Sequence, residues 1–515
     1  MKERISIELT GNNVTVEQVC QVAREKAQVK LADSARKNMQ ESRDYIEKRI
    51  ASGEVMYGIN TGFGAFSSVR INDSQLEDLQ KNLIRSHSMG LGEPFSQEQT
   101  RAIMFLRANA LARGHSGVRP LTVEKILQFL NEDIIPVIPQ QGSVGASGDL
   151  APLSHLALAI IGEGQVWSSA GTFVGVGEVL KQKKIEPLTL KAKEGLSMIN
   201  GCQVMTAVGM LAVADAKRLL GLADLSGSIT LEALRGARSA FDPLISATRP
   251  HPGEAKTARN MNKILGATSP IAESHQNCGK VQDAYSLRCI PAVHGAAKDA
   301  MGHIWQTLEI EANSSTDNPL VFAKENKVLS CGNFHGEPVA FAMDFAGIAI
   351  SALVNMSECR IQKLVNPAMS ELPAFLTPNG GLNSGHMIVQ VAAASLVSEN
   401  KILAHPASVD SIPTSADKED HVSMGTIAAR KFNQILQNAE NIIAMELLSA
   451  TQAIDLLTPL KPSGTVLAVH NLIREKVPFA IQDRIFSNDV NILRSMIKDG
   501  SLTAITEKMA GSLEF

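Results

Sequence analysis

The sequence predicts a mainly α-helical protein, a long helical bundle with a smaller N-terminal domain. From Leu188 onward the chain is dominated by Ala, Leu, Ile and Met and shows few strand signals. Apolar residues recur at helical spacing through 432–447, and the segment 338–354 is apolar almost all round, as in a buried helix. We expect an N-terminal domain of residues 1–200 and an elongated helical-bundle domain of residues 201–515.

Shorter elements are expected in the N-terminal part. Ile5, Ile7 and Leu9 alternate with Ser6 and Glu8, which is typical of a strand. Helical spacing follows, interrupted by glycine-rich loops, and a pair of short apolar runs indicates a hairpin. The expected helices lie at 15–52, 74–87 and 97–113, and the hairpin lies at 165–176.

The composition excludes several classes of protein. There are 49 Lys and Arg against 52 Asp and Glu, so the chain has no basic field for nucleic acid. The six cysteines form no C-x-x-C pair, and the twelve histidines form no H-E-x-x-H, so we expect a reducing compartment and no metal site. The longest uncharged apolar run, 345–357, is too short to span a bilayer. We therefore expect a cytoplasmic protein without membrane or nucleic-acid partners.

One glycine-rich stretch organises the interpretation of the chain. Gly-Ser-Val-Gly-Ala-Ser-Gly at 142–148 runs through Asp149, a plausible N-cap, and Pro152, which suits a first helical turn, into the apolar run 153–161. No Lys follows as in a phosphate-binding loop. A nucleophile elbow is excluded because it would need glycine at position 149.

The tripeptide Ala146-Ser147-Gly148 has the residue types that an internal cyclisation needs. Gly148 offers an unhindered backbone nitrogen, Ala146 adds little bulk beside its carbonyl, and Ser147 carries a β-leaving group. The fifteen residues 142–156 resemble the cofactor-forming segment of the aromatic amino-acid ammonia-lyase family. In that family the glycine nitrogen attacks the alanine carbonyl, whose oxygen leaves as water, and the serine hydroxyl is lost as a second water molecule. The product is a methylidene-imidazolone electrophile (MIO), and no external cofactor is needed.

Six further stretches resemble the same family, in the same order along the chain. They are 57–64, Ser86-His87, Asn200-Gly201, 280–289, 333–338 and 419–424. The resemblance implies the helical-bundle fold of the aspartase and ammonia-lyase superfamily. It also implies an amino-acid substrate and a homotetramer whose active sites draw loops from several subunits.

The resemblance also implies roles for individual residues. Tyr57 matches the base that takes the β-proton of the substrate, and Tyr285 is a second catalytic candidate. Arg288, three residues after Tyr285, has the planar fork that binds a carboxylate. The other matches are Asn200 and Gln282, for the amino-acid moiety and the cofactor carbonyl, and Phe334, an aromatic residue beside the cofactor.

The choice of substrate depends on His87 and Glu419. A carboxylate can accept an imidazole N–H, whereas a phenyl ring offers it nothing. These two residues favour the histidine-specific branch of the family, in which ammonia is eliminated from L-histidine to give trans-urocanate in histidine catabolism. Three departures from the branch pattern, Lys418, Cys331 and His386, bear on substrate identity.

Three alternatives remain open from the sequence. The first is a tyrosine or phenylalanine ammonia-lyase or an aminomutase of the same family. The second is a non-catalytic scaffold with this fold. The third is a hydrolase in which Ser147 works with His155, although that histidine lies about two turns along the following helix.

Overall fold

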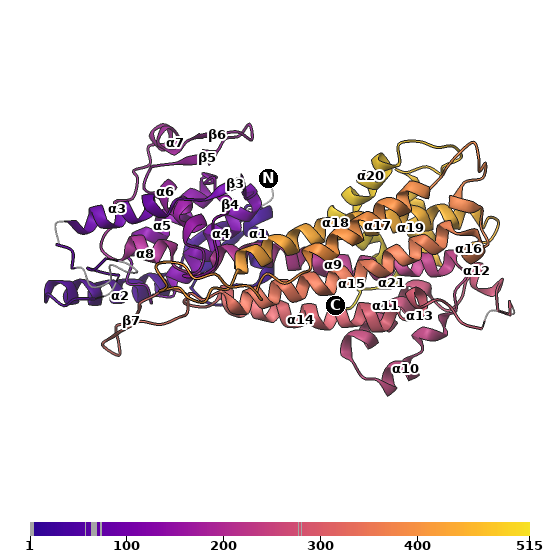
Figure 1. Cartoon of the computed structure of the whole chain (residues 1–515), viewed down its shortest axis with the longest axis horizontal. Coiled ribbons are helices and arrows are strands. Elements are labelled where there is room, and N and C mark those ends of the chain that lie inside the picture. Colours follow the sequence, from indigo (N-terminus) through magenta and orange to yellow (C-terminus); the bar gives the residue numbers. More distant parts are fainter. Residues whose placement is uncertain (1–4, 57, 63–69, 73–74, 277, 280) are drawn as a thin grey trace. The chain divides into compact units, whose positions relative to one another are not determined.

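The computed structural model describes residues 5–515 except 57, 63–69, 73, 74, 277 and 280. It is mainly helical (Figure 1), which confirms the predicted fold class. The chain packs into two compact units, each built from several stretches. The first unit holds residues 1–214, 305–344 and 406–430, and the second holds 215–304, 345–405 and 431–515. The division at residue 200 stays a prediction.

The N-terminal strand is confirmed as β1 (Ser6–Leu9). The single helix expected at 15–52 is wrong, because α1 (Val16–Arg24) and α2 (Asp33–Ala51) are separated by β2 (Gln28–Leu31). β2 pairs in parallel with β1. Backbone pairing with a neighbouring strand therefore overrides the local helical spacing of this segment.

The remaining elements of the first unit confirm the predicted helices near 74–87 and 97–113 and the predicted hairpin. The described strands of this unit pair two by two. The elements are α3 (Leu76–His87), β3 (Leu91–Pro94), α4 (Gln97–Ala112), α5 (Pro120–Asn131), β4 (Pro139–Gln141), α6 (Leu150–Ile160), β5 (Gln165–Trp167), β6 (Phe173–Gly175), α7 (Val176–Lys183), α8 (Glu194–Ile199), β7 (Leu320–Phe322) and β8 (Lys327–Leu329).

Long helices form the second unit, where they run side by side (Figure 1). The longest helices are α9 (Gln203–Ala233), α14 (Ile290–Ala312), α15 (Glu337–Val365) and α18 (Gly425–Leu456), and parts of them belong to the first unit. The others are η3 (Arg238–Phe241), α10 (Pro243–Thr248), α11 (Pro252–Leu265), α12 (Pro270–Glu273), α13 (Tyr285–Arg288), α16 (Pro367–Ser370), η4 (Ala374–Leu376), α17 (Met387–Leu403), α19 (Gly464–Arg474), α20 (Phe486–Lys498) and α21 (Ser501–Ala510).

The amphipathic pattern at 432–447 is confirmed, because its apolar residues on α18 are buried. The helix predicted at 338–354 is confirmed as α15, but its burial is incomplete: Phe341, Phe345 and Ile348 are 44%, 50% and 47% exposed. Of the described helices, α15 is the one whose length and apolar composition could cross a membrane. Its apolar stretch is 61% buried, as in the core helix of a soluble protein.

His386 lies in the core of the second unit. Its Nδ1 is 3.1 Å from Ser449 Oγ, and its ring meets Phe486 edge to face at 5.0 Å. Burial, together with the positive charges of Arg474 and Arg484, lowers the pKa of His386 from 6.5 to about 3. The unfolded chain therefore binds a proton at this residue at a pH where the folded chain does not.

His386→Phe is expected to reduce the sensitivity of the fold to acid. Because the folded pKa is depressed, the stability is fully present above the unfolded pKa and is lost as the pH falls below it. Between pH 8 and pH 5 the wild type should lose about 2 kcal/mol more than the variant. Urea unfolding at both pH values measures this difference, with the exposed His251→Ala as control. An unchanged pH dependence in His386→Phe would contradict the assignment.

Candidate active site

The backbone of the loop 142–148 is held by close contacts within the first unit. Gly148 has a φ of +73°, and a Cβ there would lie 2.3 Å from the Gly201 carbonyl oxygen. Asp149 N donates to that same oxygen at 2.8 Å. Earlier in the loop, Val144 O accepts a hydrogen bond from Met424 N at 2.9 Å. Glycine at position 148 is required both by the backbone angle and by the approach of Gly201.

Asp149 anchors the loop to the helix that follows Gly201. Asp149 occupies the predicted N-cap position of α6, but its side chain makes no capping bond there. Its Oδ2 instead accepts the amide N–H groups of Val204 and Met205, at 2.9 and 3.0 Å, in the first turn of α9. Thr426 Oγ1 donates to the other oxygen. Burial raises the pKa of Asp149 to about 6, against the lowering effect of these hydrogen bonds.

Ser147 contacts two of the predicted side chains. Its Oγ donates to Glu419 Oε1 at 2.8 Å, and Asn200 Nδ2 donates to its carbonyl oxygen at 2.9 Å. Glu419 Oε2 accepts hydrogen bonds from Thr414 and Ser415, at 2.7 and 2.8 Å. The structure therefore brings Ser147, Asn200 and Glu419 together from segments far apart in the sequence.

His87 and Phe334 are placed in the same unit. His87 Nδ1 lies 2.9 Å from the Leu83 carbonyl oxygen, which favours a proton on Nδ1 and leaves Nε2 as the acceptor. Burial lowers the pKa of His87, while the Leu83 carbonyl and the charge of Glu419 oppose that shift. The Phe334 carbonyl accepts a hydrogen bond from Cys202 Sγ at 3.0 Å. His87 is thus within the electrostatic reach of Glu419.

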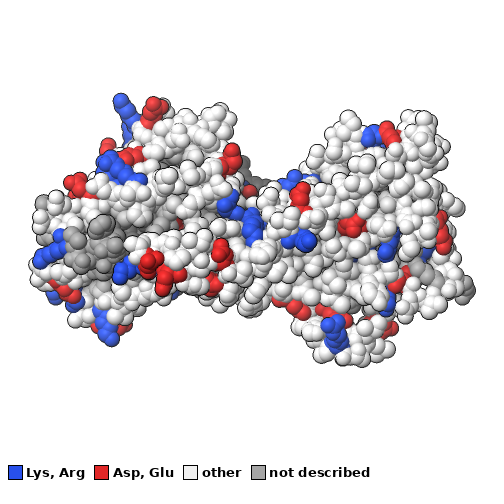
Figure 2. All heavy atoms as spheres, in the orientation of Figure 1, with Lys and Arg blue, Asp and Glu red and all other residues white. Residues whose placement is uncertain are grey.

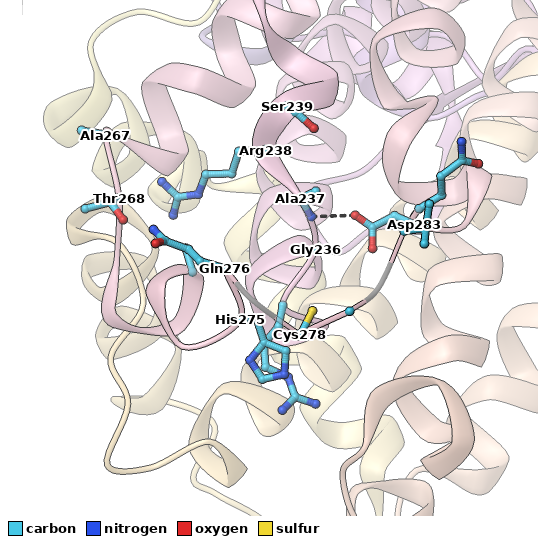
Figure 3. A pocket seen from close by; sticks show the side chains of 15 residues that line it. Gly236, Ala237, Arg238, Ser239, Ala267, Thr268, His275, Gln276, Cys278 and Asp283 are labelled. Carbon is cyan, nitrogen blue, oxygen red and sulfur yellow. Dashed lines mark hydrogen bonds between the residues drawn. The ribbon is translucent and has the colours of Figure 1, made fainter.

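The remaining described candidates, Gln282, Tyr285 and Arg288, lie in the second unit. Tyr285 and Arg288 share the short helix α13, as their spacing predicted, and the guanidinium carbon of Arg288 lies 4.5 Å from the centre of the Tyr285 ring. Tyr285 is 71% exposed. Gln282 borders an open pocket of about 370 Å³, where Asp283 accepts the Ala237 N–H at 2.6 Å (Figure 3). Tyr57 lies outside the described residues.

The hydrolase hypothesis is not supported by the described contacts. His155 Nε2 accepts the Gly90 N–H at 3.0 Å, and Ser147 donates to a carboxylate. A serine nucleophile needs an adjacent base that is itself oriented for proton transfer. His155 is engaged elsewhere and does not meet this requirement.

Comparison with known proteins identifies the family. The aromatic amino acid lyase family model matches residues 14–475. The chain belongs to this family. A histidine ammonia-lyase of Caldanaerobacter subterraneus subsp. tengcongensis is 50% identical, over 98% of this chain and 99% of that one. The crystal structure of histidine ammonia-lyase from Trypanosoma cruzi is 43% identical with a TM-score of 0.91, covering 98% of this chain and 96% of that one.

A second group of structures in the comparison consists of aminomutases. The tyrosine aminomutase from Streptomyces globisporus is 37% identical with a TM-score of 0.94, covering 99% of this chain and all of that one. As a member of the aromatic amino acid lyase family with histidine ammonia-lyases among its similar relatives, the chain is an enzyme of the ammonia-lyase class. This finding contradicts the scaffold alternative.

Several residues that support the site of this lyase were not predicted from its sequence. Arg107 is buried and donates to the backbone carbonyl oxygen of Asn200 at 3.0 Å, which fixes the backbone at that residue. Glu311 lies near Cys202, and burial raises its pKa to about 7. Thr426 holds Asp149. A charged residue inside a largely apolar run, as Arg107 is within 102–112 of α4, is the signal that sequence reasoning could have used.

Proposed function

We propose that the chain eliminates ammonia from L-histidine to give trans-urocanate, using an MIO group formed from Ala146, Ser147 and Gly148. The observation that carries the proposal is the 2.8 Å hydrogen bond from Ser147 Oγ to Glu419. Loss of the Ser147 hydroxyl as water would leave Glu419 Oε1 without this donor. An imidazole N–H of the substrate is a suitable replacement, because a partly buried carboxylate oxygen is stabilised by a hydrogen-bond donor.

The residues of the loop fit the MIO group. Gly148 has no side chain to hinder its nitrogen, and Ala146 is 6% exposed within a small apolar cluster that includes Val422 and Met424. Asn200 Nδ2 donates to the Ser147 carbonyl oxygen, the atom on which negative charge would develop. The group supplies an electron sink that assists the departure of ammonia. Asn200, held by Arg107, is the donor preorganised for that sink.

The second-unit residues complete the proposal. Arg288 would bind the substrate carboxylate through its planar fork, Gln282 would contact the amino-acid moiety, and Tyr285 would contribute to catalysis beside Arg288. Tyr57 is proposed as the base that takes the β-proton, and its phenol, with an ordinary pKa of about 10, then needs a nearby positive charge or hydrogen bond. These assignments rest on the resemblance of the motifs and on the pairing of Tyr285 with Arg288.

Incubation of the purified enzyme with L-histidine tests the proposal directly. Urocanate formation, followed by its ultraviolet absorbance, is the expected result, with L-tyrosine and L-phenylalanine as parallel substrates. Turnover of tyrosine without urocanate formation would overturn the substrate assignment. A tyrosine or phenylalanine lyase or an aminomutase remains the second candidate, because a tyrosine aminomutase shares the fold at 37% identity. Detection of a β-amino acid product would favour the aminomutase.

Glu419→Gln is expected to lower kcat/KM for histidine by at least about 10²-fold, because the charge-assisted hydrogen bond to the imidazole is lost. The amide is nearly isosteric and keeps one acceptor oxygen, so the loop should still form its contacts. The kinetic comparison uses intact mass to verify that the MIO group is present in both proteins. Equal catalytic efficiency of variant and wild type towards histidine would contradict the role of Glu419.

Gly148→Ala is expected to block formation of the MIO group. The added Cβ would lie 2.3 Å from a backbone oxygen at a φ of +73°, so the loop must move. Intact mass should show the encoded mass in the variant, whereas the wild type should lack two water molecules. Gly175→Ala is the control, since nothing lies within 4 Å of its added Cβ. A Gly148→Ala protein with the wild-type loss of mass would refute this expectation.

The enzyme is proposed to act in the cytoplasm as a homotetramer with shared active sites. None of its six cysteines forms a disulfide with another described residue, as in a reducing compartment. On the face shown in Figure 2, Lys and Arg are interspersed with Asp and Glu, which favours a small-molecule substrate over nucleic acid.

In the second unit, Ile348, Ala352 and Val397 line an apolar groove of about 560 Å³ between α15 and α17. Light scattering of the purified protein should give about four times the chain mass.

A further inference from the structure

Three side chains with metal-binding chemistry lie together in the first unit: His335, Glu337 and His421. One donor atom from each lies within 4.8 Å of the others. The two imidazole rings are stacked, with centroids 5.6 Å apart and planes inclined by 6°. His335 Nδ1 is 3.9 Å from Glu337 Oε2. That carboxylate oxygen is buried and has no hydrogen-bond partner among the described residues.

We propose that His335, Glu337 and His421 form a zinc-binding site. Two imidazole nitrogens and one carboxylate oxygen are ligands that Zn²⁺ accepts readily, whereas Mg²⁺ and Ca²⁺ prefer oxygen alone. Donor atoms on a tetrahedral zinc ion are about 3.3 Å apart, so these side chains need to approach one another by at most about 1.5 Å. His421 is exposed and can rotate to do this. Its exposure also leaves room for a water molecule as the fourth ligand.

The unpartnered Glu337 oxygen is the second observation that supports the site. A buried carboxylate oxygen without a donor is costly, and coordination to a cation would remove that cost. Motif spacing in the sequence predicted no metal site. The proposed ligands come from residues 335–337 and from His421, and these segments approach one another only in the folded chain. The proposal therefore departs from the expectation based on motifs.

The position of the site links it to the reactive loop. His335 directly follows Phe334, and His421 lies two residues after Glu419. Ser423, two residues after His421, donates a hydrogen bond from its hydroxyl to Gly145 O at 3.2 Å. A zinc ion bound here would clamp the turn that carries Phe334 to the segment that carries Glu419. Metal binding and the geometry of the active site would then be coupled.

The test measures Zn²⁺ binding to the full-length enzyme after removal of metal by a chelator. Competition with a chromophoric chelator should show one zinc ion per chain. His421→Ala and Glu337→Gln should each weaken binding at least about tenfold. His421→Ala is the primary variant because its side chain is exposed and should not affect folding. His251→Ala and Cys278→Ser, which replace an exposed histidine and an exposed thiol elsewhere, are the controls.

Co²⁺ serves as a spectroscopic probe of the same ligands. Visible bands of a four-coordinate cobalt ion without thiolate charge-transfer absorption are the expected result, and they should be lost in His421→Ala. The proposal is overturned if the enzyme takes up no stoichiometric zinc, if His421→Ala binds zinc as the wild type does, or if the spectrum shows thiolate ligands. Because the readout is binding, it is independent of whether histidine is the substrate.

Discussion

Ser147→Ala is expected to lower turnover by at least about 10³-fold while the protein folds normally. The substitution removes the only atom of the tripeptide that can leave as water from a side chain, so no exocyclic alkene can form. It also removes the hydrogen bond to Glu419, but it adds no bulk to a loop that is already closely packed. The expected intact mass is therefore that of the encoded sequence, in contrast to the wild type.

Ser154→Ala is the matched control for this experiment. Ser154 is a buried serine in α6, and its hydroxyl donates to the Leu150 carbonyl oxygen of the same helix at 2.7 Å. Its loss should leave both the mass change and the turnover close to wild type. Full activity in Ser147→Ala would show that the reaction does not need an electrophile at this position, and the proposed function would fail with it.

Arg360→Met is expected to destabilise the second unit by about 3–5 kcal/mol. Arg360 and Glu446 are fully buried on α15 and α18, and Nε and Nη2 of Arg360 donate to the two carboxylate oxygens at 2.5 and 2.9 Å. Ser226 and Thr230 on α9 donate to the same carboxylate. Removal of the arginine leaves a buried charge with only hydroxyl donors, which is the costly case for a buried ion pair.

The double variant Arg360→Met with Glu446→Leu separates the loss of the ion pair from the loss of packing. Because both charges are absent, it should be more stable than Arg360→Met alone. Urea unfolding at constant protein concentration gives the comparison, since an oligomer unfolds in a concentration-dependent manner. If the double variant were the less stable of the two, the cost would come from packing and the explanation by an unpaired charge would be wrong.

The second unit also holds a second buried charged cluster, centred on Asp224. Asp224 on α9 accepts hydrogen bonds from His294 at 2.8 Å and from Lys298 at 2.5 Å, both on α14. Burial raises the pKa of Asp224, but the charge of Lys298 and the His294 bond outweigh it and hold the pKa below its usual value. These contacts fix the register of neighbouring helices, a specificity that apolar packing alone does not provide.

The departures from the histidine-specific pattern have different structural settings. His386 is in the core of the second unit, so its replacement of the usual aromatic residue bears on acid stability. Cys331 N donates to Asn318 Oδ1 at 2.8 Å in the chain segment before Phe334. Lys418 lies in the turn closed by the pairing of Thr414 with Glu419. Of the three, only Lys418 is adjacent to Glu419, which we propose accepts the N–H of the substrate imidazole.

The sequence by itself determined the helical class, because apolar periodicity over many turns requires a buried face whatever the neighbours are. It also specified the tripeptide, since the proposed cyclisation depends on the residue types at adjacent positions. The α18 face at 432–447 and the loop ahead of α6 were predictable for these local reasons. The helical conformation of α18 and the glycine-rich turn ahead of α6 depend mainly on residues within a few turns of each other.

Only the tertiary structure decided which partners each group finds. The strand β2 could not be predicted within a helical pattern, because it depends on pairing with β1. Asp149 caps α9 rather than α6, and Glu419 reaches Ser147 from a distant segment. Local sequence specifies the donors and acceptors a residue carries, but hydrogen bonds of this kind are chosen by which chain segments burial brings together.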